Sequence, residues 1–228
     1  MNNTNVKPSN SLKLGVLLAL VAGFWGAYTY TCRGGVFGNA VTGNVVLMGI
    51  HIAEGDINKV VRFFVPTFFF SLGVILTEAL RKKFRRFTFT HWRNLIILLE
   101  ILLIFIVGFI PLEHNHTAVI IISITSSMQI STFRQVRNCP CSTTMYTGNV
   151  KSCAENLFLF IDLKERIYLT NTLVYFSLIS AFTLGAVLGA ALTYRFGFKS
   201  IWFSTAGLLI CFILMHSKKQ LITTYNDL

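Results

Sequence analysis

Charged residues are scarce in this chain. Only 13% of the 228 residues are charged, and Asp and Glu together number 9. Soluble domains are nearer one quarter charged, and the mean hydropathy here is +0.63. The composition excludes an ordinary soluble domain, and the chain also has no low-complexity segment.

Catalytic and metal-binding motifs are also missing. The chain has no phosphate-binding loop, no zinc-protease signature and no Ser, His and Asp set that spacing can assign. Five cysteines are present, but no second Cys or His pair lies near Cys139 and Cys141 in the sequence. We therefore expect a protein that is not an enzyme and holds no metal or cofactor, with Cys139-Pro140-Cys141 forming a tight bend.

Long apolar runs are what the chain has instead. Five stretches carry no Asp, Glu, Lys or Arg, and a sixth, residues 94–112, carries only Glu100. A membrane-spanning helix needs roughly 20 mostly apolar residues. The predicted fold class is an all-α integral membrane protein with six transmembrane helices. They are expected near Leu12–Tyr30, Val60–Leu80, Trp92–Ile110, Thr117–Phe133, Tyr168–Tyr194 and Ser200–Met215.

The net charge of +11 has two interpretations. A basic chain suggests nucleic-acid binding, but Lys and Arg also collect in the cytoplasmic loops of membrane proteins. With six crossings and both termini inside, 15 of the 20 Lys and Arg residues fall on the cytoplasmic side. We therefore expect a multi-pass inner-membrane (plasma-membrane) protein with cytoplasmic termini and no bound nucleic acid. An impermeant thiol reagent should then fail to label a cysteine at position 84 in intact cells.

One tetrapeptide occurs twice, as Thr42-Gly43-Asn44-Val45 and as Thr147-Gly148-Asn149-Val150. Each copy follows the first apolar run of a block of three, at an offset of 105 residues. Three crossings per block invert the second block in the membrane, a plan that recurs in secondary transporters. We predict two inverted three-helix repeats. The boundaries are a cytoplasmic tail at 1–11, repeats at 12–112 and 117–216, an external loop at 113–116 and a cytoplasmic tail at 217–228.

The two links that carry the tetrapeptide are expected to be re-entrant or discontinuous. Gly34-Gly35 and Pro140 provide breaks in the chain, and broken backbone at membrane depth usually lines a cavity. Thr can cap a half-helix, Gly admits a close approach, and Asn offers donors and an acceptor. The candidate substrate-binding residues are Thr42, Gly43, Asn44, Thr147, Gly148 and Asn149. The alternative is close helix packing, with Asn bonded across the interface.

Two further polar residues lie within apolar runs. Glu100 is in the middle of the third run, where an ionisable residue costs about 2.5–3.5 kcal/mol on insertion scales. It is the candidate for ion or proton coupling, and a protonated packing residue is the alternative. Gln129 is a candidate partner for Glu100 and a candidate substrate-binding residue, with an interhelical hydrogen bond as the alternative. Ala181, Gly185 and Gly189 form a small-residue stripe that is typical of helix packing.

These residues resemble the YoaK-type family, bacterial polytopic membrane proteins described as a domain of unknown function and as permease-like. The similarity is carried by Gly34-Gly35-Val36-Phe37 with Val41-Thr42-Gly43-Asn44, by Thr144–Asn149 followed by Leu157, and by Met128-Gln129. It covers nearly the whole chain and implies a polytopic membrane protein without naming a substrate. The family commonly has an Asp where this chain has Trp25-Gly26-Ala27, so ion coupling through that position is not expected.

The function predicted is that of a small-solute permease. It would work by alternating access between the two repeats, with its site between the two Thr-Gly-Asn segments. The alternative is a non-transporting membrane scaffold or regulatory protein. The expected partners are membrane lipids and an unidentified small solute or ion, and the sequence is compatible with a homo-oligomer.

Overall fold

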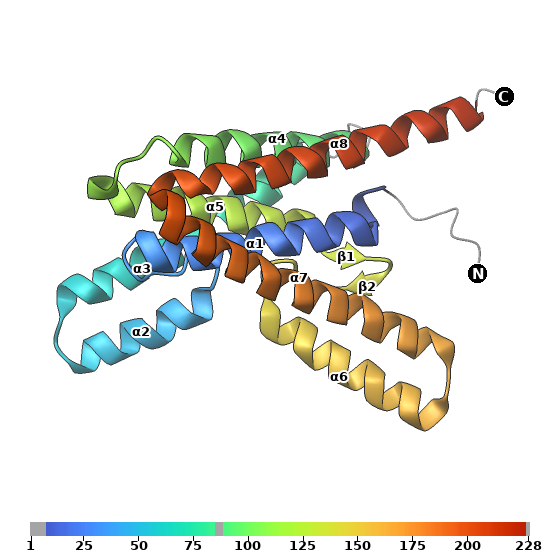
Figure 1. Cartoon of the computed structure of the whole chain (residues 1–228), viewed down its shortest axis with the longest axis horizontal. Coiled ribbons are helices and arrows are strands. Elements are labelled where there is room, and N and C mark those ends of the chain that lie inside the picture. Colours follow the sequence, from blue (N-terminus) through green and yellow to red (C-terminus); the bar gives the residue numbers. More distant parts are fainter. Residues whose placement is uncertain (1–7, 85–88, 227–228) are drawn as a thin grey trace.

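The computed structural model describes residues 8–84 and 89–226, with side chains over residues 9–84 and 92–216, and is almost entirely helical (Figure 1). Residues 1–7 of the expected N-terminal tail, residues 85–88 of the basic loop and residues 227–228 of the C-terminal tail lie outside the described residues. The expectation of an all-α protein is confirmed.

A helix forms over each of the six apolar runs. Ser11 begins the first by accepting a hydrogen bond from the Leu14 N–H (3.3 Å), and Asp56 begins the third helix of the chain by accepting one from the Lys59 N–H (3.2 Å). The last helix continues past its expected end at Met215. The six are α1 (Leu12–Cys32), α3 (Ile57–Phe84), α4 (Phe89–Val107), α5 (Asn115–Thr132), α7 (Arg166–Phe196) and α8 (Ile201–Asn226).

Three stretches of the described chain are both long enough and apolar enough to cross a membrane. They are Leu12–Cys32, Ile57–Phe84 and Arg166–His216, which correspond to α1, α3 and α7 running on into α8. Large apolar side chains such as Phe68, Phe176 and Ile213 are exposed on these helices, as expected of surfaces that face lipid. These observations support an all-α membrane protein.

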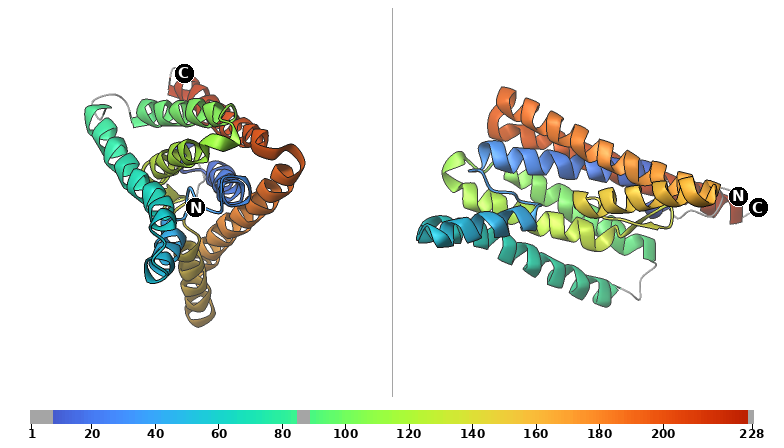
Figure 2. Two further views of the ribbon diagram at one scale, coloured as in Figure 1. Left: turned by 90° about the vertical axis from the view of Figure 1, so that its left-hand side faces the viewer. Right: turned by 90° about the horizontal axis from the view of Figure 1, so that it is seen from below.

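Helices α1 and α5 lie in the interior, and the other long helices surround them (Figure 2). Helix α1 packs along α7 and α8, while α3 packs along α5, and α4 packs against α5 and α8. Trp25 and Tyr28 of α1 are fully buried. The Trp25 indole N–H donates to the Ser204 hydroxyl of α8 (3.0 Å), which ties the first helix to the last.

Glycines let helices from the two halves of the chain touch. A Cβ added at Gly185 of α7 would overlap the Leu20 carbonyl of α1, and one added at Gly189 would crowd the Phe24 carbonyl. The expected packing role of the small-residue stripe is therefore confirmed. In the same way, a Cβ added at Gly73 of α3 would overlap the Ser127 hydroxyl of α5.

Two shorter helices, α2 (Val41–Ala53) and α6 (Tyr146–Leu163), follow α1 and α5. Both begin near the middle of the molecule and run outward in opposite directions (Figure 1). The 13 residues of α2 span about 20 Å at 1.5 Å per residue, which is less than the hydrocarbon thickness of about 30 Å. Helix α2 packs on α3, and α6 packs on α7.

The chain enters α6 through a small β-hairpin of β1 (Gln135–Val136) and β2 (Cys139–Pro140). Its turn is made by Arg137 and Asn138, whose φ angles are 48° and 66°. The expectation that Pro140 makes the bend was wrong, because Pro140 lies in β2 opposite Gln135. Burial raises the pKa of the Cys141 thiol to about 12, so this thiol is protonated at neutral pH.

Candidate functional site: a cavity between the two Thr-Gly-Asn segments

A cavity of about 1010 Å³ lies where α2 and α6 begin. Its wall is built by α1, α3 and α7 together with the first turns of α2 and α6. None of the described residues that line it is charged, and aromatic rings from Tyr30, Phe37, Phe70, Tyr146 and Phe182 contribute to the wall. The structure thus brings the two Thr-Gly-Asn segments, 105 residues apart in sequence, to one apolar space.

Both short helices present uncapped N-termini to this cavity. The residues before their first turns are Ala40 and Met145, and neither side chain caps its helix. Thr42 and Thr147 lie inside the first turns and line the cavity, so the suggestion that Thr caps each helix was wrong. The first N–H groups of a helix have no partner within it, and they carry a partial positive charge. The cavity therefore receives hydrogen-bond donors from two helices.

Asn44 and Asn149 hold the chain that leads into each helix. The Asn44 side-chain amide donates to the Phe37 carbonyl (2.6 Å) and its oxygen accepts from the Phe37 N–H (3.1 Å). Asn149 makes the same pair of bonds with Ser142, at 2.6 and 3.3 Å. We call each arrangement an Asn clamp. In both cases the clamped residue lies seven positions before the Asn, so the two clamps share one geometry.

The residues of the two motifs therefore divide into two groups. Thr42, Gly43 and Thr147 line the cavity, whereas the buried Asn44 and Asn149 lie behind it. Gly148 does not line it, and a Cβ added there would meet no atom within 4 Å. Solute binding by these residues stays a prediction. The clamps show that both Asn side chains help to hold the fold, as the helix-packing alternative expected. Their bonds, however, go to nearby backbone and not to another helix.

Asn39 is a polar residue of the cavity wall that sequence reasoning missed. It is 3% exposed, and its side-chain amide donates to the Ala22 carbonyl of α1 (2.7 Å). Its side-chain oxygen has no hydrogen-bond partner in the described part of the chain, and it lies close to Gly26, which also lines the cavity. An acceptor thus accompanies the helix-end donors. The available signal was an Asn in an otherwise apolar link.

Gln129 joins three segments next to the cavity. Its side-chain amide donates to the Leu18 carbonyl of α1 (3.1 Å) and to the Thr143 hydroxyl before α6 (2.9 Å). Its neighbour Ile130 lines the cavity, but Gln129 does not. The expected pairing of Gln129 with Glu100 is not formed, because neither Glu100 oxygen has a hydrogen-bond partner among the described residues.

Glu100 lies away from the cavity, on α4. It is fully buried, in the same helix as the core residues Ile97 and Ile104, and it is not part of the cavity wall. An ionised carboxylate buried without a partner costs several kcal/mol at least, roughly as charges inside membranes do. The Glu100 side chain makes no hydrogen bond among the described residues that would stabilise the fold.

Comparison with known proteins agrees with the membrane architecture. The family model described as "Protein of unknown function (DUF1275)" matches residues 14–214, which include both Thr-Gly-Asn segments. The chain is 26% identical over 217 residues to the UPF0700 transmembrane protein YoaK of Bacillus subtilis (strain 168), covering 90% of this chain and 93% of that protein. No solved structure matches the chain.

Proposed function

The chain belongs to the DUF1275 family of proteins of unknown function, and from its geometry we propose that it is a small-solute permease. It is a helical membrane protein with a large cavity between two helix starts. The observation that carries the proposal is that the uncapped first turns of α2 and α6 meet at one uncharged cavity. Interrupted helices whose ends face a central cavity are a recurrent way for transporters to bind solutes.

The proposal includes six crossings arranged as two inverted repeats, α1–α4 and α5–α8. Support comes from the packing, which repeats when each helix of the first group is exchanged for its counterpart in the second. Helix α1 packs on α7 as α5 packs on α3, α1 packs on α8 as α5 packs on α4, and α2 packs on α3 as α6 packs on α7. The two Asn clamps follow the same correspondence.

The proposed orientation places both termini in the cytoplasm and the protein in the inner membrane. The start of α1 and the end of α8 lie at the same end of the molecule (Figures 1 and 2), as an even number of crossings requires. The distribution of Lys and Arg along the chain supports the cytoplasmic assignment of that end.

Alternating access would come from movement between two groups of helices that each combine helices of both repeats, instead of between the two repeats themselves. One group is α1 with α6 and α7, and the other is α3 with α2 and α5, because these helices pack most closely within each group. The cavity lies between the groups. A solute with an apolar body would contact the aromatic wall. Its polar end would accept from helix N–H groups and donate to the Asn39 oxygen.

Glu100 is proposed to serve proton or ion coupling from outside the cavity. Its burial on α4 without a partner among the described residues supports this role, because ionisable residues inside membrane-spanning segments commonly mark ion pathways and proton relays. Glu100→Gln should remove the pH dependence of uptake while leaving solute binding unchanged. An unchanged pH profile would assign the residue to packing.

The experiment that tests the permease proposal is a ligand screen by thermal stabilisation of the purified protein. Amino acids, sugars, nucleobases and ions are screened, and stabilising compounds are then tested for uptake into proteoliposomes. Thr42→Val should weaken binding about 5- to 150-fold if its hydroxyl contacts solute, as for the loss of a hydrogen bond in a buried site. Thr170→Val, at an exposed position of α7, is the matched control.

Two results would contradict the proposal. Failure of every compound to stabilise the protein, together with no uptake, would favour the scaffold or regulatory alternative. A solute whose affinity is the same in the wild type, Thr42→Val and Thr147→Val proteins would place the binding site elsewhere.

A further inference from the structure

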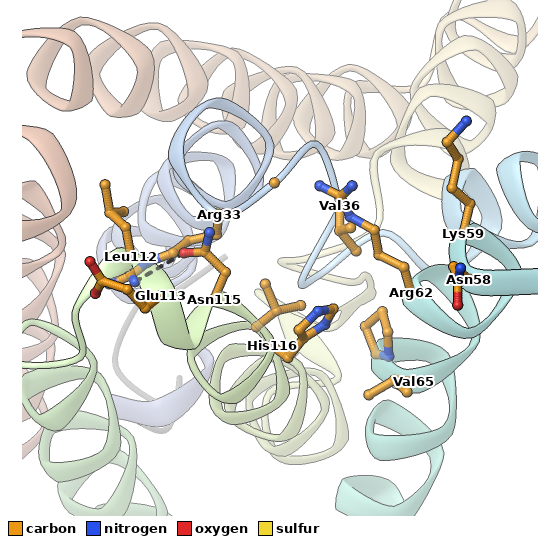
Figure 3. A pocket seen from close by; sticks show the side chains of 13 residues that line it. Arg33, Val36, Asn58, Lys59, Arg62, Val65, Leu112, Glu113, Asn115 and His116 are labelled. Carbon is orange, nitrogen blue, oxygen red and sulfur yellow. Dashed lines mark hydrogen bonds between the residues drawn. The ribbon is translucent and has the colours of Figure 1, made fainter.

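A second pocket, of about 400 Å³, lies where α1 ends and α3 and α5 begin (Figure 3). We call it the basic pocket. Arg33, Lys59 and Arg62 line it, together with Asn58, Asn115 and His116. Glu113 is its single carboxylate among the described lining residues. The pocket thus has an excess of positive charge and side chains rich in N–H donors.

Arg33 contributes a buried charge that no carboxylate neutralises. It is 1% exposed, and none of the ion pairs in the described chain includes it. All of its hydrogen-bond acceptors are uncharged. They are the Tyr28 hydroxyl (2.9 Å), the Asn115 side-chain oxygen (3.3 Å) and the carbonyls of Val107, Ile110 and Pro111 (3.3, 2.8 and 3.2 Å). These carbonyls satisfy the guanidinium at the end of α4, but they leave a full positive charge beside the pocket.

Arg62 contributes a guanidinium with no hydrogen-bond or ion-pair partner in the described chain. It extends from α3 toward Val36 and the loop that follows α1, whereas Glu113 lies on the side of Arg33 and Asn115 (Figure 3). The backbone makes room for it, because a Cβ added at Gly34 would overlap the Arg62 guanidinium. Gly34 has a φ of 94°, which glycine adopts without strain.

The remaining groups complete a set of donors. Lys59 forms an ion pair with Asp56 (3.0 Å), which largely neutralises its positive charge. Asn115 accepts from Arg33 through its oxygen, which leaves its NH₂ group available. Guanidinium forks match the geometry of oxyanions and bind them through short, charge-assisted hydrogen bonds.

The geometry points to an anion site in the basic pocket, with Arg62 as the residue that binds a phosphate-type oxyanion. Arg33 supplies a fixed positive charge behind it, and the side-chain NH₂ of Asn115 is a further donor. The oxyanion is either free in solution or carried by a phospholipid headgroup, since both present the same chemistry to the pocket. The site does not depend on transport through the central cavity.

The test is a titration of inorganic phosphate into delipidated protein in detergent at low ionic strength, followed by calorimetry. Low salt is needed because exposed charges are screened within about 10 Å at 0.1 M. Arg62→Gln should weaken binding at least about tenfold, as loss of a charge-assisted contact does. Arg62→Lys should have an intermediate effect, because it keeps the charge and loses the fork. Lys151→Gln, which removes an exposed cation on α6 paired with Glu155, should leave binding unchanged.

The two sources of the oxyanion are distinguished by native mass spectrometry of protein exchanged into phosphatidylglycerol. Loss of a retained lipid in Arg62→Gln, together with displacement of phosphate by that lipid, identifies a headgroup site. Phosphate binding without lipid retention identifies a site for a free anion. The proposal is overturned if phosphate and lipid bind to the wild type and to both Arg62 variants with equal affinity. It is also overturned if none of these proteins binds phosphate or lipid. In both cases the thermal unfolding profiles must show that all three proteins are folded.

Discussion

The chain enters α2 through a glycine turn and enters α6 through a β-hairpin. In the first half, Gly34 and Gly35 have φ angles of 94° and 70°, and in the second half the turn falls on Arg137 and Asn138. Despite the different routes, each helix begins next to the same kind of Asn clamp. The difference shows that the repeated motif does not fix the path of the link. It fixes the last four residues before the helix start, Phe37–Ala40 in one half and Ser142–Met145 in the other.

The surroundings of the two motifs also differ. A Cβ at Gly43 would crowd the Phe37 ring, whereas one at Gly148 would be in open space. Ser142 adds a hydroxyl that accepts from the Met145 N–H (3.0 Å), and Phe37, at the matching position, has no hydroxyl. The first segment therefore depends on its clamp more than the second does. The halves also differ where they touch, because Gly185 meets backbone and Gly73 meets chiefly a side chain.

The largest effect is expected from Gly185→Ala, compared with Gly73→Ala in the other half. The new methyl at position 185 meets the Leu20 carbonyl, so α1 and α7 must separate at a cost of about 3 kcal/mol. At position 73 the main obstacle is the Ser127 hydroxyl, and adding Ser127→Ala should recover part of the loss. Thermal unfolding in detergent measures both. Full rescue of Gly185→Ala by a side-chain change at Leu20 would contradict the backbone contact.

A smaller loss is expected when the Asn clamps are removed. Asn44→Ala leaves the Phe37 N–H and carbonyl without partners, which costs about 1–2 kcal/mol. Asn149→Ala should cost less, because Ser142 still holds the Met145 N–H. The measurement is the unfolding free energy of each variant alongside solute affinity. A variant that keeps wild-type stability but loses solute binding would mean that the Asn acts on the solute and not on the fold.

The smallest effect is expected from Gly148→Ala compared with Gly43→Ala. In a helix, Ala is about 0.5–1 kcal/mol more favourable than Gly, and position 148 has room for the methyl. Gly148→Ala should therefore raise the unfolding temperature, whereas at position 43 movement of the Phe37 ring should offset the gain. Equal gains at both positions would show that the crowding seen at Gly43 is easily relieved.

The helices could be predicted from sequence because their signal is local. Uncharged runs bounded by Lys, Arg and Glu predicted where all six long helices lie, and the spacing of Gly185 and Gly189 predicted a packing face. The repeated tetrapeptide predicted a cavity between its two copies, and a cavity lies there. Solute binding in that cavity stays a prediction.

The details of the site could not be predicted because they depend on backbone geometry. Each Asn clamp binds backbone groups, so the clamped residue can be Phe37 or Ser142, and no side-chain pattern marks it. The hairpin depends on positive φ angles at Arg137 and Asn138. Neither residue is Gly, so the sequence gives no sign of a turn there. Gln129 was placed beside Glu100 because both are polar in apolar runs, yet its partners come from α1 and the link before α6.

The burial of α1 has a consequence for how the protein is made. Helix α1 is synthesised well before α7 and α8, along which it packs. Until α8 is translated, Trp25 lacks Ser204, the partner of its indole N–H. An interior helix of the nascent chain therefore lacks these packing partners until α7 and α8 are made, and contacts so distant in sequence form slowly. A ribosome that stops before α7 would leave in the bilayer a helix suited to a protein interior, which is the kind of substrate that membrane quality control removes.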